Sequence, residues 1–159
     1  MKTSQIGIDL IKHFEGLHDG DLKTIGLQPK KCPAGIWTVG YGHAMRDVNG
    51  NFMKGSKMPN HTITEKQAEE LLKQDLEVFE RIVMVKIKVP LKQNQFDALV
   101  SHTYNTGGSD TLFYLINSKA KDIEIKKWFE TKYITGGGKV LNGLVARRKA
   151  ESKLYFFGT

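Results

Sequence analysis

Apolar residues recur at helical spacing near the start of the chain. The apolar positions that share one face are Ile8, Leu10, Ile11 and Phe14. Thr3 or Ser4 can cap the first turn, and Gly16 can end the helix because glycine readily adopts the left-handed conformation. The pattern therefore predicts a helix that ends at Glu15.

A longer helical pattern begins at Thr64, which forms a capping box with Gln67. The apolar positions that follow at helical spacing are Ala68, Leu71, Leu72, Leu76, Phe79 and Val83. This helix is long enough to join two lobes. Further helices are predicted over residues 92–104, near 109–117, near 123–130 and over about 143–156.

Between the first two helices the pattern changes to one typical of β-structure. Residues 32–43 (CPAGIWTVGYGH) read as a strand interrupted by glycines, and Asn49-Gly50 predicts a hairpin turn. Residues 136–139 (GGGK) are interpreted as a flexible connector. The predicted fold class is α+β, with a small β-hairpin or sheet lobe and a larger helical lobe joined by the long helix.

One domain is predicted over residues 1–159, because no linker divides the chain. Its sheet lobe would span about 16–60, and its helical lobe about 64–159 plus the N-terminal helix.

Glu15 is the first candidate for chemistry. A carboxyl group at a helix C-terminus meets the negative end of the helix dipole, and partial burial removes water from its charged form. Both effects favour the protonated form, which suits a general acid. The alternative interpretation is an ordinary solvated carboxylate.

Several segments resemble the phage-type lysozymes, or endolysins, of glycoside hydrolase family 24. They are residues 14–16 (FEG), 32–43, 63–70 (ITEKQAEE), 90–101 (PLKQNQFDALVS), 104–107 (YNTG) and 143–151 (GLVARRKAE). The family's catalytic positions are a Glu, then an Asp or Cys, then a Thr six residues beyond the second. The matching residues here are Glu15, Cys32 and Thr38.

The resemblance implies a lysozyme-like fold and hydrolysis of the β-1,4 bond between N-acetylmuramic acid and N-acetylglucosamine in peptidoglycan. Glu15 would protonate the glycosidic oxygen while a water held by Thr38 and Cys32 attacks the anomeric carbon. Tyr104 and Asn105 match the family's sugar-binding step at the cleft, although Tyr104 fits a core position equally well. The family also implies a monomer without a cofactor or metal, held in the host cytoplasm until a holin opens the membrane.

The connection between Glu15 and Cys32 is clearly longer than is usual in the family. We interpret residues 18–31 as an insertion, most simply a solvated loop with Gly20 and Gly26 as turn residues. If the insertion folds back over the cleft, Asp19 or Asp21 can supply a second carboxylate.

Cys32 leaves alternatives open. An ordinary thiol has a pKa of about 8.5, so it would be a weaker base than Asp and would act mainly by position. Cys32 can instead be a nucleophile with His43 as base, as in a peptidase that cuts peptide stems, or a buried inert residue. Its place before Pro33 at the start of a strand argues against the nucleophile. For His43 a structural pairing with Asp75 is favoured over catalysis. A lytic transglycosylase, which also uses one Glu, is a further alternative.

The composition adds a positive charge and a single cysteine. The formal charge is +7, and residues 119–159 hold ten Lys or Arg against four Asp or Glu, which gives +6. Such a surface is attracted to anionic wall polymers or outer-membrane lipopolysaccharide. No nucleic-acid-binding motif is present, so that partner is not expected. One cysteine excludes an intrachain disulfide, and the N-terminus predicts neither a signal peptide nor an anchor.

The basic C-terminal helix offers a second class of function. Its apolar residues Leu144, Val145, Leu154, Tyr155 and Phe156 lie opposite Arg147, Arg148 and Lys149 in the predicted pattern. An amphipathic cationic helix of this kind can disturb an anionic membrane without catalysis.

Overall fold

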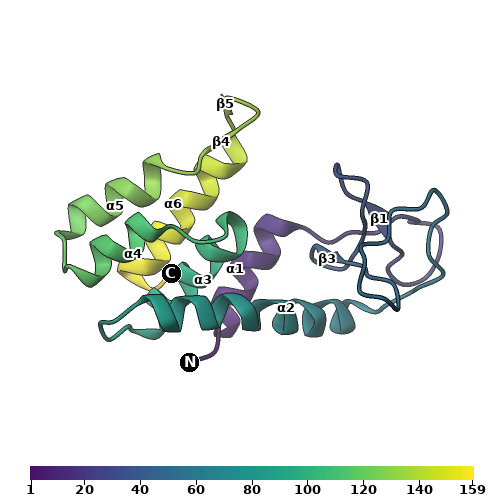
Figure 1. Cartoon of the computed structure of the whole chain (residues 1–159), viewed down its shortest axis with the longest axis horizontal. Helices are drawn as coiled ribbons and strands as arrows, with labels where there is room; N and C mark the ends of the chain where they lie inside the picture. Colours follow the sequence, from purple (N-terminus) through teal and green to yellow (C-terminus); the bar gives the residue numbers. More distant parts are fainter. The chain divides into compact units, whose positions relative to one another are not determined.

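The computed structural model describes all residues from 1 to 159 and contains six helices and five short strands. The helices are α1 (Gln5–Glu15), α2 (Glu65–Lys86), α3 (Gln93–Thr106), α4 (Asp110–Asn117), α5 (Asp122–Thr131) and α6 (Asn142–Phe157). The strands are β1 (Lys30–Lys31), β2 (Trp37–Val39), β3 (His43–Ala44), β4 (Thr135–Gly136) and β5 (Lys139–Val140). Figure 1 shows these elements along the chain. The predicted α+β class is confirmed, and each predicted helix is present.

The chain forms two compact units. The helical unit consists of Met1–Phe14 and Leu76–Thr159, and the sheet unit consists of Glu15–Asp75. Helix α2 therefore begins in the sheet unit and ends in the helical unit. Residues 64–75, which the sequence assigned to the helical lobe, group with the sheet. None of the helices is long and apolar enough to cross a membrane.

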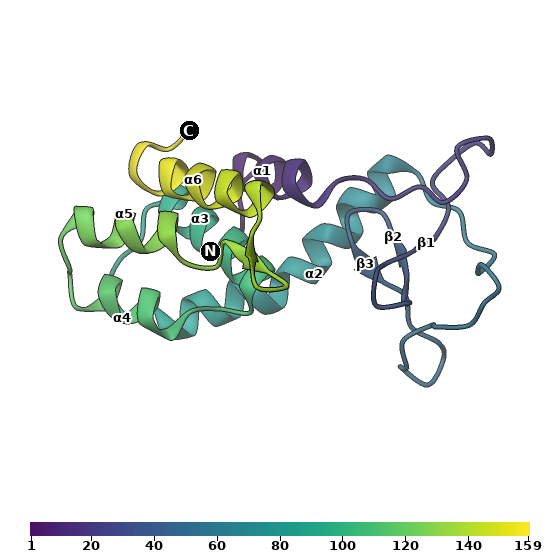
Figure 2. The same ribbon diagram turned by 90° about the horizontal axis from the view of Figure 1, so that it is seen from above.

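The helical unit is built around α3. Helix α6 packs against α3 and α5, and Figures 1 and 2 show α3, α4, α5 and α6 lying side by side. The core side chains that are fully buried include Phe96, Leu99, Leu112 and Phe129. The start of the chain is tied to this core because the Thr3 backbone and hydroxyl each donate to Glu80 Oε1 over 2.8 Å. Phe96, Leu99 and Val100 on α3 are all fully buried.

Residues 136–139 form a turn, so the prediction of a flexible connector was wrong. Strands β4 and β5 pair in antiparallel register, with Thr135 opposite Val140 and Gly136 opposite Lys139. Gly137 and Gly138 have φ angles of +57° and +77°. Two consecutive residues with positive φ define the tight hairpin turn that joins antiparallel strands, and glycine adopts this conformation without steric cost.

The sheet unit contains a three-stranded antiparallel sheet in the order β1-β2-β3. All three residues of the central strand β2 are buried. The single strand predicted over 32–43 is instead two strands, because Gly40 and Gly42 turn the chain with φ angles of +64° and +90°. Gly40 is also required by a close approach to α2, since an added Cβ would lie 2.9 Å from the Ala68 Cβ.

Two local predictions in this unit are confirmed. The Thr64 backbone N–H donates to Gln67 Oε1 over 2.9 Å, and the Gln67 N–H donates to Thr64 Oγ1 over 3.1 Å, which completes the capping box. The Asn49-Gly50 turn is closed by the Gly50 N–H, which donates to the Asp47 carbonyl over 3.0 Å. Bridge pairing of Arg46 with Phe52 continues this hairpin.

Candidate active site

Glu15 is the last residue of α1 and the first residue of the sheet unit, as its position before a terminating glycine predicts. Gly16 takes φ of +73°, which ends the helix. The side chain of Glu15 is half-buried. A carboxyl group in this position meets the negative helix end and is partly removed from water, as the sequence predicts.

A backbone bridge ties the segment after Glu15 to the central strand. The His18 N–H donates to the Gly40 carbonyl over 2.8 Å. Gly40 follows β2, the strand that carries Thr38. His18 is three positions after Glu15 in the chain, a reach of at most about 10 Å. The bridge therefore holds Glu15 near the end of β2 within the sheet unit.

Cys32 is placed by a tight turn between β1 and β2. The Cys32 N–H donates to the Ile36 carbonyl over 2.9 Å, and the Gly35 N–H donates back to the Cys32 carbonyl over 2.9 Å. Gly35 has φ of +79°, so this turn also depends on glycine. The half-exposed thiol therefore sits at the rim of a hairpin of fixed register.

Cys32 and Thr38 lie on the same face of that hairpin. Lys30 is directly opposite Thr38 in the β1–β2 register, and Cys32 is two residues after Lys30. Side chains two apart on a strand share a face, so Cys32 and Thr38 are diagonal neighbours. Thr38 is buried, and its hydroxyl donates to the Ile36 carbonyl over 3.2 Å. The six-residue step between them is thus the result of this register.

The hairpin changes the acidity of the thiol. Hydrogen bonding to the Ile36 backbone lowers the pKa of Cys32 from its ordinary value, and the Ala34 backbone and the Thr38 hydroxyl lower it further. Partial burial opposes the shift. The sequence interpretation assumed an ordinary thiol, whereas the folded hairpin holds more thiolate near neutral pH. More of Cys32 is therefore present as thiolate, the form that can accept a proton, than its residue type alone indicates.

Sequence reasoning missed two residues near the predicted acid. Burial lowers the pKa of His18, the positive charge of Lys30 lowers it further, and the negative charge of Glu15 opposes both. His18 is thus close enough to both residues to feel their charges, and Lys30 lies opposite Thr38. The signal available in the sequence was the unusual length of the 18–31 segment, whose first and penultimate residues are these two.

Asp19 and Asp21 are used within the insertion. Asp19 Oδ1 accepts from the Asp21 and Gln28 backbones over 3.1 and 3.2 Å. Asp21 accepts from the Lys23 N–H over 3.0 Å and from the Thr24 hydroxyl over 2.6 Å. Both carboxylates therefore order the loop, which gives them a structural role in place of the second-carboxylate role considered from the sequence.

His43 pairs with Asp75, as predicted. Its Nδ1 lies 2.8 Å from Asp75 Oδ2. His43 is opposite Val39 in the sheet, so it lies on the face opposite to that of Thr38 and Cys32. This placement argues against a Cys32 nucleophile with His43 as its base.

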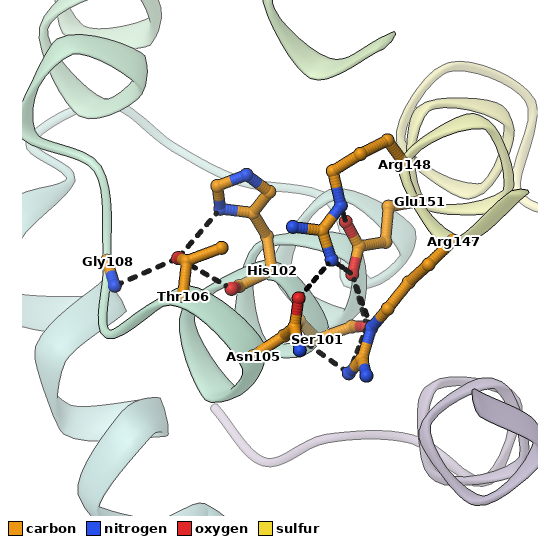
Figure 3. A network of polar contacts seen from close by, with 8 residues as sticks. All are labelled: Ser101, His102, Asn105, Thr106, Gly108, Arg147, Arg148 and Glu151. Atoms are coloured by element: carbon orange, nitrogen blue, oxygen red, sulfur yellow. Dashed lines mark hydrogen bonds and ion pairs between the residues drawn. The ribbon is translucent and has the colours of Figure 1, made fainter. Parts of the chain in front are cut away.

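Tyr104 and Asn105 lie on α3 in the helical unit. The Tyr104 ring is half-buried and meets Phe79 edge-to-face, with the ring centroids 5.1 Å apart. Asn105 is exposed, and its Oδ1 accepts from Arg148 Nη2 over 2.8 Å (Figure 3). The side chain of Asn105 is therefore oriented by α6.

Arg147 and Arg148 are buried, although the sequence pattern places them opposite the apolar face of the last helix. Arg147 Nε lies 3.1 Å from Glu151 Oε1, and Arg148 Nε lies 2.9 Å from Glu151 Oε2 (Figure 3). The Arg148 N–H is poorly aligned on that oxygen, so this contact is an ion pair more than a hydrogen bond. Ser101 Oγ also donates to Glu151 Oε1 over 2.7 Å.

The same packing removes the membrane-active face predicted for the last helix. Leu154 and Tyr155 are buried in the helical unit. Two of the cationic side chains predicted on the opposite face, Arg147 and Arg148, are buried as well. Helix α6 is thus a core element, which disfavours a peptide-like action on membranes.

The comparison with known families decides the identity of the fold. A family model described as phage lysozyme matches residues 12–151. The chain belongs to the phage lysozyme family. The prediction of a phage-type lysozyme is therefore confirmed.

Individual relatives and solved structures are similar to this chain over nearly its whole length. An endolysin of Bacillus phage PZA is 39% identical over 166 residues, covering 100% of this chain and 57% of the relative. The solved endolysin from Escherichia coli O157:H7 phage FAHEc1 is 35% identical, with a TM-score of 0.78 and coverage of 100% and 96%. The muramidase domain of SpmX from Asticaccaulis excentricus is 28% identical, with a TM-score of 0.74 and coverage of 98% and 97%.

The chain spans little more than half the length of the Bacillus phage endolysins that it matches. It corresponds in extent to the phage FAHEc1 endolysin and to the SpmX muramidase domain. No group of three or more His, Cys, Asp or Glu side chains is placed to hold a metal ion. Within the phage lysozyme fold, Glu15, Cys32 and Thr38 belong to the sheet unit, whereas Tyr104 and Asn105 belong to the helical unit.

Proposed function

We propose that this chain is an endolysin that hydrolyses the β-1,4 bond between N-acetylmuramic acid and N-acetylglucosamine in bacterial peptidoglycan and thereby lyses the host. The single observation that carries the proposal is the backbone bridge from His18 to Gly40. It connects a carboxyl group at a helix end to the strand that holds Thr38 beside Cys32. Membership of the phage lysozyme family supports the same reaction.

In the proposed reaction Glu15 is the general acid that protonates the glycosidic oxygen as the bond breaks. A water molecule, held by the Thr38 hydroxyl and the Cys32 sulfur, attacks the anomeric carbon from the other face. The lowered pKa of Cys32 supports a role for its thiolate as acceptor of the proton from that water. A water held in this way favours hydrolysis over the transglycosylase reaction, in which the sugar forms an anhydro end without water.

Tyr104 and Asn105 are proposed sugar-binding residues. The Tyr104 ring has the size and partial exposure to lie against a sugar face. The Asn105 carbonyl oxygen accepts from Arg148, so the amide NH₂ is the group that would donate to an N-acetyl carbonyl. An Asn105 held in this way gives up little side-chain entropy on binding.

The remaining expectations on partners and location also belong to the proposal. The substrate is the cell wall, reached from the host cytoplasm after holin-dependent release, and the enzyme acts as a monomer. The charge of +7 supports attraction to anionic wall polymers or lipopolysaccharide, an attraction that salt weakens.

The test is digestion of purified peptidoglycan with identification of the new ends by mass spectrometry, using the chain and its Glu15→Gln variant. Reducing N-acetylmuramic acid ends that are lost in the variant support the proposal. Glu70→Gln is the matched control because Glu70 is an exposed glutamate of the same unit. Anhydro ends would show a transglycosylase, cleaved peptide stems would point to Cys32 as a nucleophile, and no new ends would overturn bond cutting altogether.

A further inference from the structure

The loop of residues 20–28 exposes two large aliphatic side chains. Leu22 is 88% exposed and Ile25 is 97% exposed. Single exposed aliphatic residues are common on protein surfaces and need no explanation. Two of them lie within four residues here, in an insertion that the proposed reaction does not use. This arrangement needs an explanation.

The base of this loop is fixed by backbone contacts. The Gly20 N–H donates to the Gln28 carbonyl over 3.1 Å, so the two ends of the loop meet. An added Cβ at Gly20 would lie 2.0 Å from the Pro29 carbonyl oxygen, which shows how closely the strands of the base approach. Leu27 and Ile63 exchange two backbone hydrogen bonds of 2.8 and 3.1 Å, which attach the loop to the segment before α2.

The apex is fixed as well. Asp21 accepts from the Lys23 backbone and from the Thr24 hydroxyl, and these bonds hold the turn between Leu22 and Ile25. In Figure 2 the loop is the dark purple segment that turns back on itself before β1. The two aliphatic side chains are therefore held on a preformed turn. Binding to a partner would cost little conformational entropy in the loop.

The charge around the loop is slightly positive, because residues 19–31 hold three lysines against Asp19 and Asp21, which gives +1. Residues 22–31 contain Lys23, Lys30 and Lys31 and no acidic residue, and all three lysines are exposed. Lys23 lies between the two aliphatic residues in the chain. The nearby carboxylates of Asp19 and Asp21 accept hydrogen bonds from the loop itself. The loop thus combines an apolar tip that carries Lys23 with a cationic C-terminal flank of Lys30 and Lys31.

We propose that the loop of residues 20–28 is an interfacial anchor that places Leu22 and Ile25 in the outer part of an anionic phospholipid bilayer. Lipid headgroups supply the negative charge for the lysines, and acyl chains supply the apolar phase for the two side chains. Glycan strands and peptide stems offer no such apolar phase. A protein partner would need a far larger surface than two side chains on one loop.

This inference goes beyond the proposed function, because membrane binding by the loop requires no bond cutting. The expected sizes follow from the chemistry. Full burial of a leucine or isoleucine changes a partition constant by about tenfold or more. Each lysine near an anionic surface changes the constant by about fivefold. Loss of both aliphatic side chains should therefore weaken binding by at least about tenfold even when insertion is shallow.

The experiment is sedimentation of the whole chain with vesicles of phosphatidylethanolamine and phosphatidylglycerol, with phosphatidylcholine vesicles in parallel. The test variant is Leu22→Ser with Ile25→Ser, and a second variant is Lys23→Gln with Lys30→Gln. The matched control is Val48→Ser, because Val48 is 101% exposed on a different turn of the same unit. Glu15→Gln should bind like the parent, which separates this proposal from the proposed reaction.

The expected result is binding to the anionic vesicles only, at least about tenfold weaker in the aliphatic variant and unchanged in the control. The variants' melting temperatures should match the parent's, because the substituted side chains are exposed. Equal binding to phosphatidylcholine, equal loss in the Val48 control, or no binding to any vesicle would overturn the anchor. Binding to insoluble peptidoglycan that depends on the lysines but not on Leu22 and Ile25 would assign the loop to the wall and overturn it too.

Discussion

His43 Nδ1 lies 2.8 Å from Asp75 Oδ2, and this contact joins strand β3 to helix α2 within the sheet unit. The hydrogen bond to Asp75 raises the pKa of His43, with a further contribution from the Asp75 charge. Burial and the positive charge of Arg46 oppose the rise. Protonated His43 is therefore stabilised by folding. The ion pair stabilises the fold most at pH values below 6.5, the pKa of His43 in the unfolded chain. This electrostatic stabilisation is lost as the pH rises through the raised pKa of the folded state.

Asp75→Asn should destabilise the protein in mild acid more than in base. Because the two side chains are 33% and 29% exposed, we expect a loss of about 0.5–1 kcal/mol near pH 5.5. The loss should shrink towards pH 8.5, as His43 loses its proton. Urea unfolding at the two pH values checks this, with Glu70→Gln as the control. A loss of equal size at both pH values would contradict the charged pair.

His102 should make the protein sensitive to acid in the opposite sense. Burial lowers its pKa to about 3, and the charges of Arg148 and Arg147 lower it further. In the unfolded chain His102 is protonated as the pH falls through about 6.5, whereas in the folded chain it stays neutral until much lower pH. The free energy of unfolding therefore decreases as the pH falls below that value. We expect His102 to decrease the free energy of unfolding by about 2 kcal/mol as the pH falls from 7 to 5.

His102→Gln removes this titration. The variant is expected to be less stable than the parent at neutral pH, because His102 packs between the rings of Phe129 and Tyr133. Its stability should nevertheless fall less steeply between pH 7 and 5. Denaturant unfolding across that range measures the slope. An unchanged slope would assign the acid sensitivity to other groups.

Cys32 should be more reactive in the folded protein than in the unfolded chain near neutral pH. The Ile36 backbone and the Thr38 hydroxyl lower its pKa. The rate of alkylation by iodoacetamide should therefore rise with pH around a midpoint that lies at lower pH in the native state than in the unfolded chain. The chain has a single cysteine, which makes the measurement specific. Thr38→Val should move the midpoint upward, and identical midpoints in native and urea-unfolded protein would refute the shift.

Arg148→Ala should be severely destabilising. It leaves Glu151, which is fully buried, without one of its two cationic partners, a change that typically costs about 3–5 kcal/mol. Lys126→Ala, at the more exposed pair with Glu130, should cost less than about 1 kcal/mol. A double-mutant cycle with Glu151→Leu measures the coupling by urea unfolding. Additive losses would mean that Arg148 and Glu151 do not stabilise each other.

The helices could be predicted because their apolar spacing and caps are local properties of the sequence. Thr64 and Gln67 are three residues apart, and Gly16 directly follows the helix that it ends. The hairpin at Gly137 and Gly138 could not, since glycines carry no side chain to signal which strands they join. A run of glycine is compatible with either a tight turn or a flexible segment.

The residues of the proposed site come from the sequence, whereas their surroundings could not be predicted from it. Glu15, Cys32 and Thr38 follow from residue type and from resemblance to phage lysozymes. The nearness of His18 and Lys30 depends on pairing between residues far apart in the chain, such as His18 with Gly40. Arg148 shows the same limit, because its positive charge predicts exposure until its pairing with Glu151 and its contact with Asn105 are known.

The meeting of Gly20 and Gln28 means that the insertion does not lengthen the path between Glu15 and Cys32. A chain that left at Gly20 and returned at Gln28 through a two-residue turn would reach the same strand. Residues 21–26 form a loop that is closed at its base by the Gly20–Gln28 contact and attached beside the base by the Leu27–Ile63 pair. The entropic cost of closing such a loop rises only slowly with its length. The tip of this loop could therefore be lengthened, shortened or exchanged while the hairpin that carries Cys32 and Thr38 stays as it is.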